Sequence, residues 1–220
     1  MFLFFLVLVL NVVISVWNCY AVGIAWKDTM AFGGWFNKTL LWSGVIQSGV
    51  GFSMPIMLIL GFGASFFLSS GENPMFTLEE ADQILQGMFS LWYVLVIFPV
   101  LGSGLAIWAH SLREAYRRRD FGSIAVAGYN SFAQIHNMVS AANNLGGAFG
   151  NVGELFGKAL DSKGGKGKDK LFILLIILVI VAIIAGFMIA FALVRHYASN
   201  TDSRIEEYGD QIERQRYANR

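Results

Sequence analysis

The sequence predicts an all-α integral membrane protein with four transmembrane helices and an amphipathic cytoplasmic element. Three observations lead to this prediction. Only 14% of the 220 residues are charged and 55% are hydrophobic, whereas about a quarter of the residues in ordinary soluble domains are charged. Four stretches lack charge over the ~20 residues that a helix needs to cross a bilayer. They are apolar on all sides, which favours helices over barrel strands: 1–26, 39–71, 83–109 and 171–194.

The first predicted transmembrane helix covers residues 1–26. A secretory signal peptide is the alternative, but the stretch "MFLFFLVLVL" has no Lys or Arg before its apolar run, so the usual basic region is missing. We therefore expect a retained membrane helix. Its Cys19 is the single cysteine of the chain, which excludes an internal disulfide framework.

The second predicted helix covers residues 39–70 and is interrupted by Pro55. A straight helix of this length would measure ~48 Å, which exceeds the ~30 Å hydrocarbon core of a bilayer. Proline removes a backbone hydrogen bond and kinks a helix. We expect this helix to be kinked or broken near Pro55, and we favour a static kink because no matching broken helix indicates a transport site.

The third predicted helix covers residues 78–120 and has a basic cytoplasmic extension. Thr77 and Glu80 have the spacing of a capping box at its start. Pro99 predicts a kink within the membrane. After Ala109, the stretch "HSLREAYRRRD" lacks Gly and Pro and favours continued helix.

Residues 121–170 are predicted to form a cytoplasmic, amphipathic, Gly-rich segment followed by a Lys/Gly linker. Apolar residues recur at helical spacing on one side, opposite Asn130, Gln134, Asn137 and Asn144. The many glycines weaken an isolated helix, so this segment needs support. Three alternatives stay open: a helix at the bilayer surface, a glycine-faced contact between subunits, and a plain loop.

The fourth predicted helix covers residues 171–195 and is followed by a polar external tail at 196–220. The tail contains Ile205, Tyr208 and Ile212 at helical spacing. The sequence does not decide between a short helix that docks on a partner and a disordered tail.

The charges predict the orientation, because Lys and Arg concentrate in cytoplasmic loops. The 110–170 connection contains nine Lys and Arg residues and the 72–82 connection contains none. We expect the former to be cytoplasmic, with both termini outside (N-out and C-out) in a plasma or inner membrane. Seven of the basic residues are predicted to contact anionic lipid headgroups: Arg117, Arg118, Arg119, Lys163, Lys166, Lys168 and Lys170.

Small and polar side chains within the predicted spans are candidates for helix packing or for a pore. Small residues let helix backbones approach closely, and Asn or Gln can form hydrogen bonds across the contact. These faces either hold the bundle of one chain together or line a subunit interface or a narrow polar path. The candidates are Asn11, Ser15, Asn18, Gln47, Gly51 and Gly186.

The four apolar stretches contain no Asp, Glu, Lys, Arg or His. Proton relays, ion pathways and intramembrane catalysis normally depend on such residues. His110 and Glu114 lie one turn apart, but two ligands are too few for a metal site. We therefore expect no enzymatic activity, no cofactor and no bound metal. The "GGKGKDK" tract does not match a phosphate-binding loop, and we expect no nucleic-acid partner.

These observations favour a non-enzymatic, multi-span subunit of a larger membrane assembly, with a structural or scaffold role of the kind found in secretion or translocation machinery. The expected partners are membrane lipid and other membrane protein subunits or further copies of the chain. The alternative is a small homo-oligomeric channel or pore. A membrane-bound enzyme or secondary transporter is the third and least favoured hypothesis, because the spans lack charge.

Overall fold

The fold is entirely helical in the part of the chain that the computed structural model describes, which is the backbone of residues 2–70, 77–161 and 168–218 and the side chains of 6, 8–70, 77–157 and 172–201. Five helices follow one another: α1 (Phe2–Phe32), α2 (Trp35–Ser69), α3 (Leu78–Arg118), α4 (Phe121–Asp161) and α5 (Lys168–Ala218). Four segments are long and apolar enough to cross a membrane: Leu8–Phe32, Trp35–Ser69, Leu78–Arg118 and Phe172–Thr201. The predicted all-helical fold class with four long apolar helices is confirmed.

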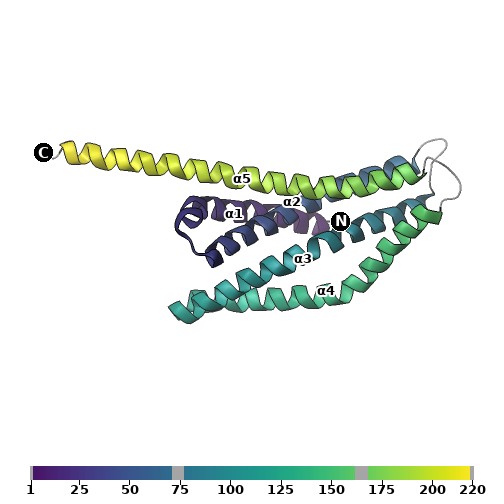
Figure 1. Cartoon of the computed structure of the whole chain (residues 1–220), viewed down its shortest axis with the longest axis horizontal. Coiled ribbons are helices and arrows are strands. Elements are labelled where there is room, and N and C mark those ends of the chain that lie inside the picture. The colour runs from purple at the N-terminus through teal and green to yellow at the C-terminus, as the bar shows by residue number, and fades with distance from the viewer. Residues whose placement is uncertain (1, 71–76, 162–167, 219–220) are drawn as a thin grey trace.

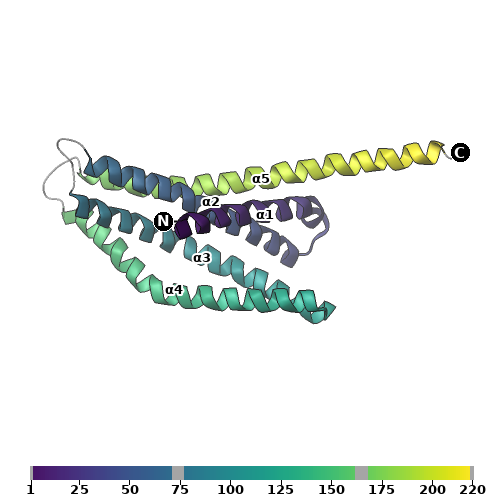
Figure 2. The same cartoon turned by 180° about the vertical axis from the view of Figure 1, so that it is seen from behind.

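Each helix runs antiparallel to the one before it (Figures 1 and 2). α1, α3 and α5 are therefore parallel to one another. The contacts between α1 and α5 show this directly, because Cys19 meets Ala190 and Gly23 meets Val194 and Tyr197 further along both helices. Parallel spans have their C-terminal ends on the same side of a membrane. The predicted N-out and C-out arrangement requires antiparallel α1 and α5, so it disagrees with this packing.

The hydrophobic core consists of two clusters, and both contain residues of α2 and α5. Each cluster is built from side chains that are at most 9% exposed. The first joins α2 and α5 to α3, with Met57, Leu68, Ile84, Met88, Leu91, Leu175, Val179 and Ala182. The second joins them to α1, with Cys19, Val22, Leu41, Val45, Phe52, Ala190 and Val194. α2 and α5 thus form the central pair of the bundle.

α3 begins with the predicted capping box. The Thr77 amide donates to Glu80 Oε2 at 2.9 Å, and the Glu80 amide donates to Thr77 Oγ1 at 3.2 Å. The helix continues past Ala109 to Arg118, as predicted. Arg119 then adopts a left-handed conformation with φ of 55°, which ends the helix and turns the chain back into α4.

α4 packs mainly against α3 and lies beside it along most of its length (Figure 1). Its buried residues recur every seven positions. This repeat keeps the same side of a helix in contact with one partner helix over several turns. The helix is visibly bent in its C-terminal half (Figure 1), where the glycines concentrate, and glycine is a known cause of helix bends. The buried positions are Ala127, Gln134, Ala141, Ala148 and Leu155.

The helices differ in how closely they follow the bundle. α2 continues through Pro55 and α3 through Pro99, so neither proline ends its helix.

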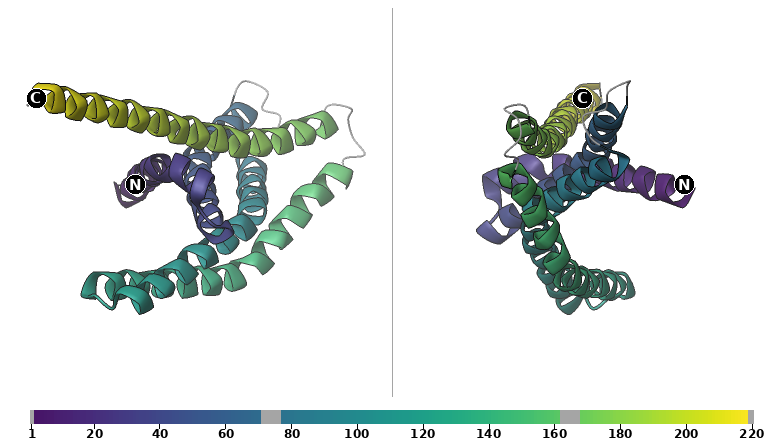
Figure 3. Two further views of the ribbon diagram at one scale, coloured as in Figure 1. Left: turned by 60° about the vertical axis from the view of Figure 1, so that its left-hand side comes forward. Right: turned by 90° about the vertical axis from the view of Figure 1, so that its right-hand side faces the viewer.

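The N-terminal part of α1 points away from the other helices in the right-hand view of Figure 3. α5 extends far beyond the bundle at its C-terminal end as one continuous helix (Figure 1).

Candidate functional site

Three of the predicted packing residues lie together where α1 crosses α2. Ser15 is only 3% exposed and its hydroxyl donates to the Asn11 carbonyl oxygen at 2.8 Å. Gly51 faces these two residues, and a Cβ atom at this position would collide with the Ser15 hydroxyl. The Asn11 amide also lies 3.5 Å from the Met54 sulfur. These residues therefore allow the two helices to approach closely within one chain.

Gln47 joins α2 to α3. Its side-chain amide donates to the Val100 carbonyl oxygen at 3.1 Å and to Ser103 Oγ at 2.7 Å. Val100 directly follows Pro99, and Ser103 lies one turn further along α3 and itself donates to the Val100 carbonyl oxygen at 3.0 Å. Gln47 thus takes part in packing between helices of one chain.

Replacing Gln47 with leucine is expected to destabilise the bundle modestly. Two hydrogen bonds between helices are lost, and each contributes about 0.6 kcal/mol on average in membrane proteins. We expect the free energy of unfolding to fall by about 1 kcal/mol, measured by denaturant unfolding in mixed micelles. A Gln47→Glu variant that is as stable as the wild type would contradict this assignment, since the donor amide is lost there too.

Gly186 lies at the closest approach of α2 and α5. A Cβ atom placed on Gly186 would lie 2.5 Å from the Ser53 backbone nitrogen and 2.8 Å from the Ser53 Cα. It would also collide with the Gly49 carbonyl oxygen. Ser53 is fully buried and accepts a hydrogen bond of 3.0 Å from the Trp92 indole. This contact joins the central pair of helices and also ties them to α3.

The other predicted residues do not gather in one place. Asn18 is half-buried and forms no hydrogen bond through its side chain with another described residue. Arg117 and Arg118 both pair with Glu114, at 3.0 and 2.8 Å, and Arg119 lies over the Tyr116 ring. The side chains of the predicted lipid contacts Lys163, Lys166, Lys168 and Lys170 lie outside the described residues.

α4 carries a regular row of asparagines, of which the sequence analysis identified three. Asparagine recurs every seven residues, so the four side chains share one side of the helix. We call this set the amide stripe: Asn130, Asn137, Asn144 and Asn151. The seven-residue repeat could have been found from the sequence, but its relation to α3 could not.

The amide stripe accompanies the apolar part of α3. Near one end, the Gln134 amide donates to the Leu101 carbonyl oxygen at 3.3 Å. Near the other end, the Asn151 amide donates to Ser90 Oγ at 3.0 Å. Asn144 lies between these two contacts, about level with the middle of the uncharged stretch 83–109 of α3.

Part of this polar surface has no partner within the described part of the chain. Asn137 and Asn143 are exposed and form no side-chain hydrogen bond there, while Asn144 bonds only to Ser140 on the same helix. An amide in hydrocarbon without a hydrogen bond costs several kcal/mol. A helix that carries such amides within a bilayer therefore needs another polar surface or water beside them.

The glycines of α4 are equally unexplained by packing within the chain. A Cβ atom added at Gly146, Gly147, Gly150 or Gly153 would meet nothing within 4 Å. Each glycine costs a helix about 1 kcal/mol relative to alanine. Because α3 leaves these positions open, their close-packing capacity is available only to something outside the described chain.

Comparison of the chain with protein-family profiles, with curated proteins and with solved structures found no match. Among the described side chains, no three His, Cys, Asp or Glu residues form a group that could hold a metal ion. The surface of α4 offers amide groups, which can both donate and accept hydrogen bonds.

Proposed function

We propose that this protein is a non-enzymatic subunit of a membrane assembly, in which another polypeptide covers the amide stripe. The observation that carries the proposal is the position of Asn137 and Asn144, exposed on α4 and level with the apolar part of α3. Amides hydrogen-bond across helix contacts within membranes. The open glycines beside the stripe suit a close helix approach.

The proposal includes α4 as a fifth crossing of the membrane. Residues 121–153 contain no Asp, Glu, Lys or Arg. This part of α4 therefore brings no carboxylate, ammonium or guanidinium group into the hydrocarbon. In this proposal α4 crosses the membrane beside α3 instead of lying in the cytoplasm. The N-terminus of the chain is then outside, and α5 ends on the inside. Seven basic residues at the end of the bundle with the α1–α2 and α3–α4 turns support this orientation: Lys27, Lys38, Arg113, Arg117, Arg118, Arg119 and Arg195. They outnumber the five lysines at the adjoining ends of α4 and α5 and between them, which this orientation places outside: Lys158, Lys163, Lys166, Lys168 and Lys170.

Replacing both Asn137 and Asn144 with leucine is expected to make the assembly dissociate into monomers. The change removes the donors and acceptors that would pair across the interface, while leucine remains compatible with helix and lipid. We expect the wild type to appear in a complex well above its monomer mass of 24.3 kDa after detergent-free extraction into native nanodiscs. Native mass spectrometry should detect the double variant mainly as a monomer.

The matched control is a double substitution on the apolar side of the same helix. Ile135 and Val139 are 60% and 54% exposed, and changing both to leucine alters side-chain shape without touching the amides. This variant should assemble like the wild type. A wild type that is purely monomeric, or an N137L/N144L complex of unchanged abundance, would contradict the proposal.

A homo-oligomeric pore is the second candidate, favoured by the regular recurrence of amides along α4. A polar side chain every seven residues provides hydrogen-bond partners for water along several turns of helix. This function requires that native mass spectrometry find copies of this chain only. Liposomes that contain the wild type should then leak small ions faster than liposomes with N137L/N144L, whereas a tight wild type would exclude the pore.

A further inference from the structure

A cavity of about 1000 Å³ lies between the helix pair α1–α2 and the helix pair α3–α4. We propose that it binds the phosphate-bearing headgroup of an anionic membrane lipid, with an acyl chain along its apolar wall. Four helices contribute to this cavity, which we call the basic cavity. Asn130 of the amide stripe lines it, but Asn137 and Asn144 do not. The proposal requires neither an assembly nor a pore.

The wall of the basic cavity changes from apolar to polar along its depth. The apolar part contains Ala21 and Val22 of α1, Leu41 of α2, and Ile107 of α3. These residues lie in the first three predicted membrane-spanning helices, near the end of each that faces the α1–α2 and α3–α4 turns. A lipid has the same succession of an apolar chain and a charged headgroup, whereas a free anion matches only the polar part.

The polar part has a surplus of cations. Arg113, Arg117 and Arg118 line it together with Glu114 and Asp120, so three cations minus two carboxylates leave one positive charge. Glu114 pairs with Arg117 and Arg118. Arg113 forms no ion pair with a described residue, and its guanidinium lies 5.7 Å from the centre of the Phe36 ring. Arg113 is therefore available for a phosphate, which guanidinium groups bind with paired hydrogen bonds.

His110 lines the basic cavity beside Arg113 and has a ring nitrogen without a hydrogen-bond partner in the described part of the chain. Its Nδ1 atom is buried and has no hydrogen-bond partner within the described residues, although its ring lies against the Phe36 ring at 6.2 Å between centres. Buried polar atoms are almost always hydrogen-bonded, so each exception calls for a partner. His110 and Arg113 both line the basic cavity. Because Nδ1 is buried, the His110 ring must turn before this atom can donate to a phosphate there, whereas Arg113 can bind one directly.

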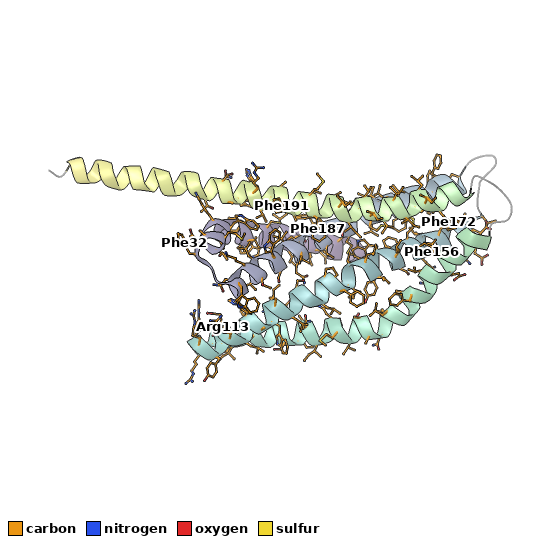
Figure 4. All side chains as sticks on the ribbon, in the orientation of Figure 1. Phe32, Arg113, Phe156, Phe172, Phe187 and Phe191 are labelled. Atoms are coloured by element: carbon orange, nitrogen blue, oxygen red, sulfur yellow. The ribbon has the colours of Figure 1, made fainter. Side chains whose placement is uncertain are left out.

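The position of the basic cavity fits the level of lipid headgroups. Arg113 lies near the end of the bundle that also carries Phe32 and the α1–α2 turn (Figure 4). Trp26, Trp42 and Trp108 lie near this end of their helices, and tryptophan is enriched where a membrane meets water. Basic pockets between transmembrane helices are typical binding sites for anionic headgroups.

Arg113→Gln and Arg119→Gln form a matched pair for the test. Each removes one guanidinium that makes no ion pair with a described residue, and each guanidinium lies over an aromatic ring, Phe36 or Tyr116. Of these two arginines, Arg113 lines the basic cavity and Arg119 does not. A nonspecific attraction of lipids to surface charge would weaken equally in both variants, whereas a site in the cavity responds to Arg113 alone.

The experiment measures lipids that stay bound when full-length protein is released from nanodiscs and analysed by native mass spectrometry. The nanodiscs contain phosphatidylcholine with or without phosphatidylglycerol. The wild type and R119Q should retain phosphatidylglycerol in preference to phosphatidylcholine. R113Q should retain it roughly tenfold less, as expected for one lost charge-assisted contact. Equal retention by R113Q and R119Q, or no lipid preference in the wild type, would overturn the proposal.

A second arm separates a lipid from a free anion. Inorganic phosphate is added to wild-type protein in phosphatidylcholine nanodiscs, and the thermal unfolding temperature is compared with that in phosphatidylglycerol nanodiscs. A ligand that binds only the folded state raises this temperature. We expect phosphatidylglycerol to raise it in the wild type but not in R113Q, with little effect of phosphate. An equal rise with inorganic phosphate would overturn the lipid assignment and identify a site for a soluble anion.

Discussion

Replacing Gly186 with alanine is expected to separate the two central helices and to cost the bundle much of its stability. The added methyl group would meet backbone atoms of Gly49 and Ser53 rather than the end of a flexible side chain. Overpacking of a core typically costs about 1–3 kcal/mol, and we expect a loss near ~3 kcal/mol because backbone atoms can yield only if the helices move apart. Gly186→Leu should prevent folding altogether.

Gly102→Ala is the control for this substitution. Gly102 lies in α3, and a Cβ atom there would meet nothing within 4 Å. Alanine is favoured over glycine within a helix by about 1 kcal/mol, so this variant should be as stable as the wild type or slightly more stable. Stability is measured by following tryptophan fluorescence during denaturant unfolding in mixed micelles. A Gly186→Ala protein that unfolds like Gly102→Ala would show that α2 and α5 are not in close contact.

Single cysteines at the two ends of α4 are expected to react with a membrane-impermeant maleimide from opposite sides of the membrane. The substitutions are Phe121→Cys at the start of the helix and Gly157→Cys near its end, each with Cys19 replaced by serine. Phe121 is 88% exposed, and a Cβ atom at Gly157 meets no other atom within 4 Å. If α4 crosses the membrane beside α3, right-side-out vesicles label one position and inverted vesicles label the other.

Phe32→Cys provides the reference for sidedness. Phe32 is 89% exposed at the turn between α1 and α2, near the same end of the bundle as the α3–α4 turn (Figure 1). It should react from the same side as the cysteine at 121. Labelling of 121 and 157 from one common side would refute the fifth crossing. It would also contradict the parallel packing of α1, α3 and α5 within one membrane, because four crossings alone make α3 and α5 antiparallel.

The local features of the fold were predictable from the sequence because they depend on residues close together in the chain. The apolar stretches predict four membrane-spanning helices by length alone. Thr77 and Glu80 predict the start of α3, because a capping box needs only a spacing of three residues. The continuation of α3 to Arg118 likewise follows from helix propensity.

The course of α4 was not predictable from the same signals. Its asparagines and glycines lower its hydropathy, so residues 121–161 resemble a surface segment rather than a span. What keeps this helix beside α3 is a set of distant contacts, such as those of Gln134 with Leu101 and Asn151 with Ser90. Such contacts cannot be read from periodicity, so the position of α4 beside α3 and the parallel packing of α1 and α5 could not be predicted from the sequence.

The candidate residues were found more easily than their roles. Ser15, Gln47, Gly51 and Gly186 were selected because small and polar residues suit helix packing, and all four take part in contacts between helices of one chain. A sequence does not say whether such a residue faces its own bundle or a neighbour. The basic cavity was missed because four helices, far apart in the sequence, contribute to it.

Because α5 is one continuous helix, a tilt of its part within the bundle also moves its C-terminal part. The backbone from Thr201 to Ala218 is helical, which corresponds to roughly 27 Å at 1.5 Å per residue. Because no break separates this length from the helix that packs on α2, a tilt of about 10° within the membrane would carry the far end sideways by about 5 Å. Small adjustments where α5 crosses α2 at Gly186 can therefore be transmitted, enlarged, to whatever lies beside the helix outside the bilayer.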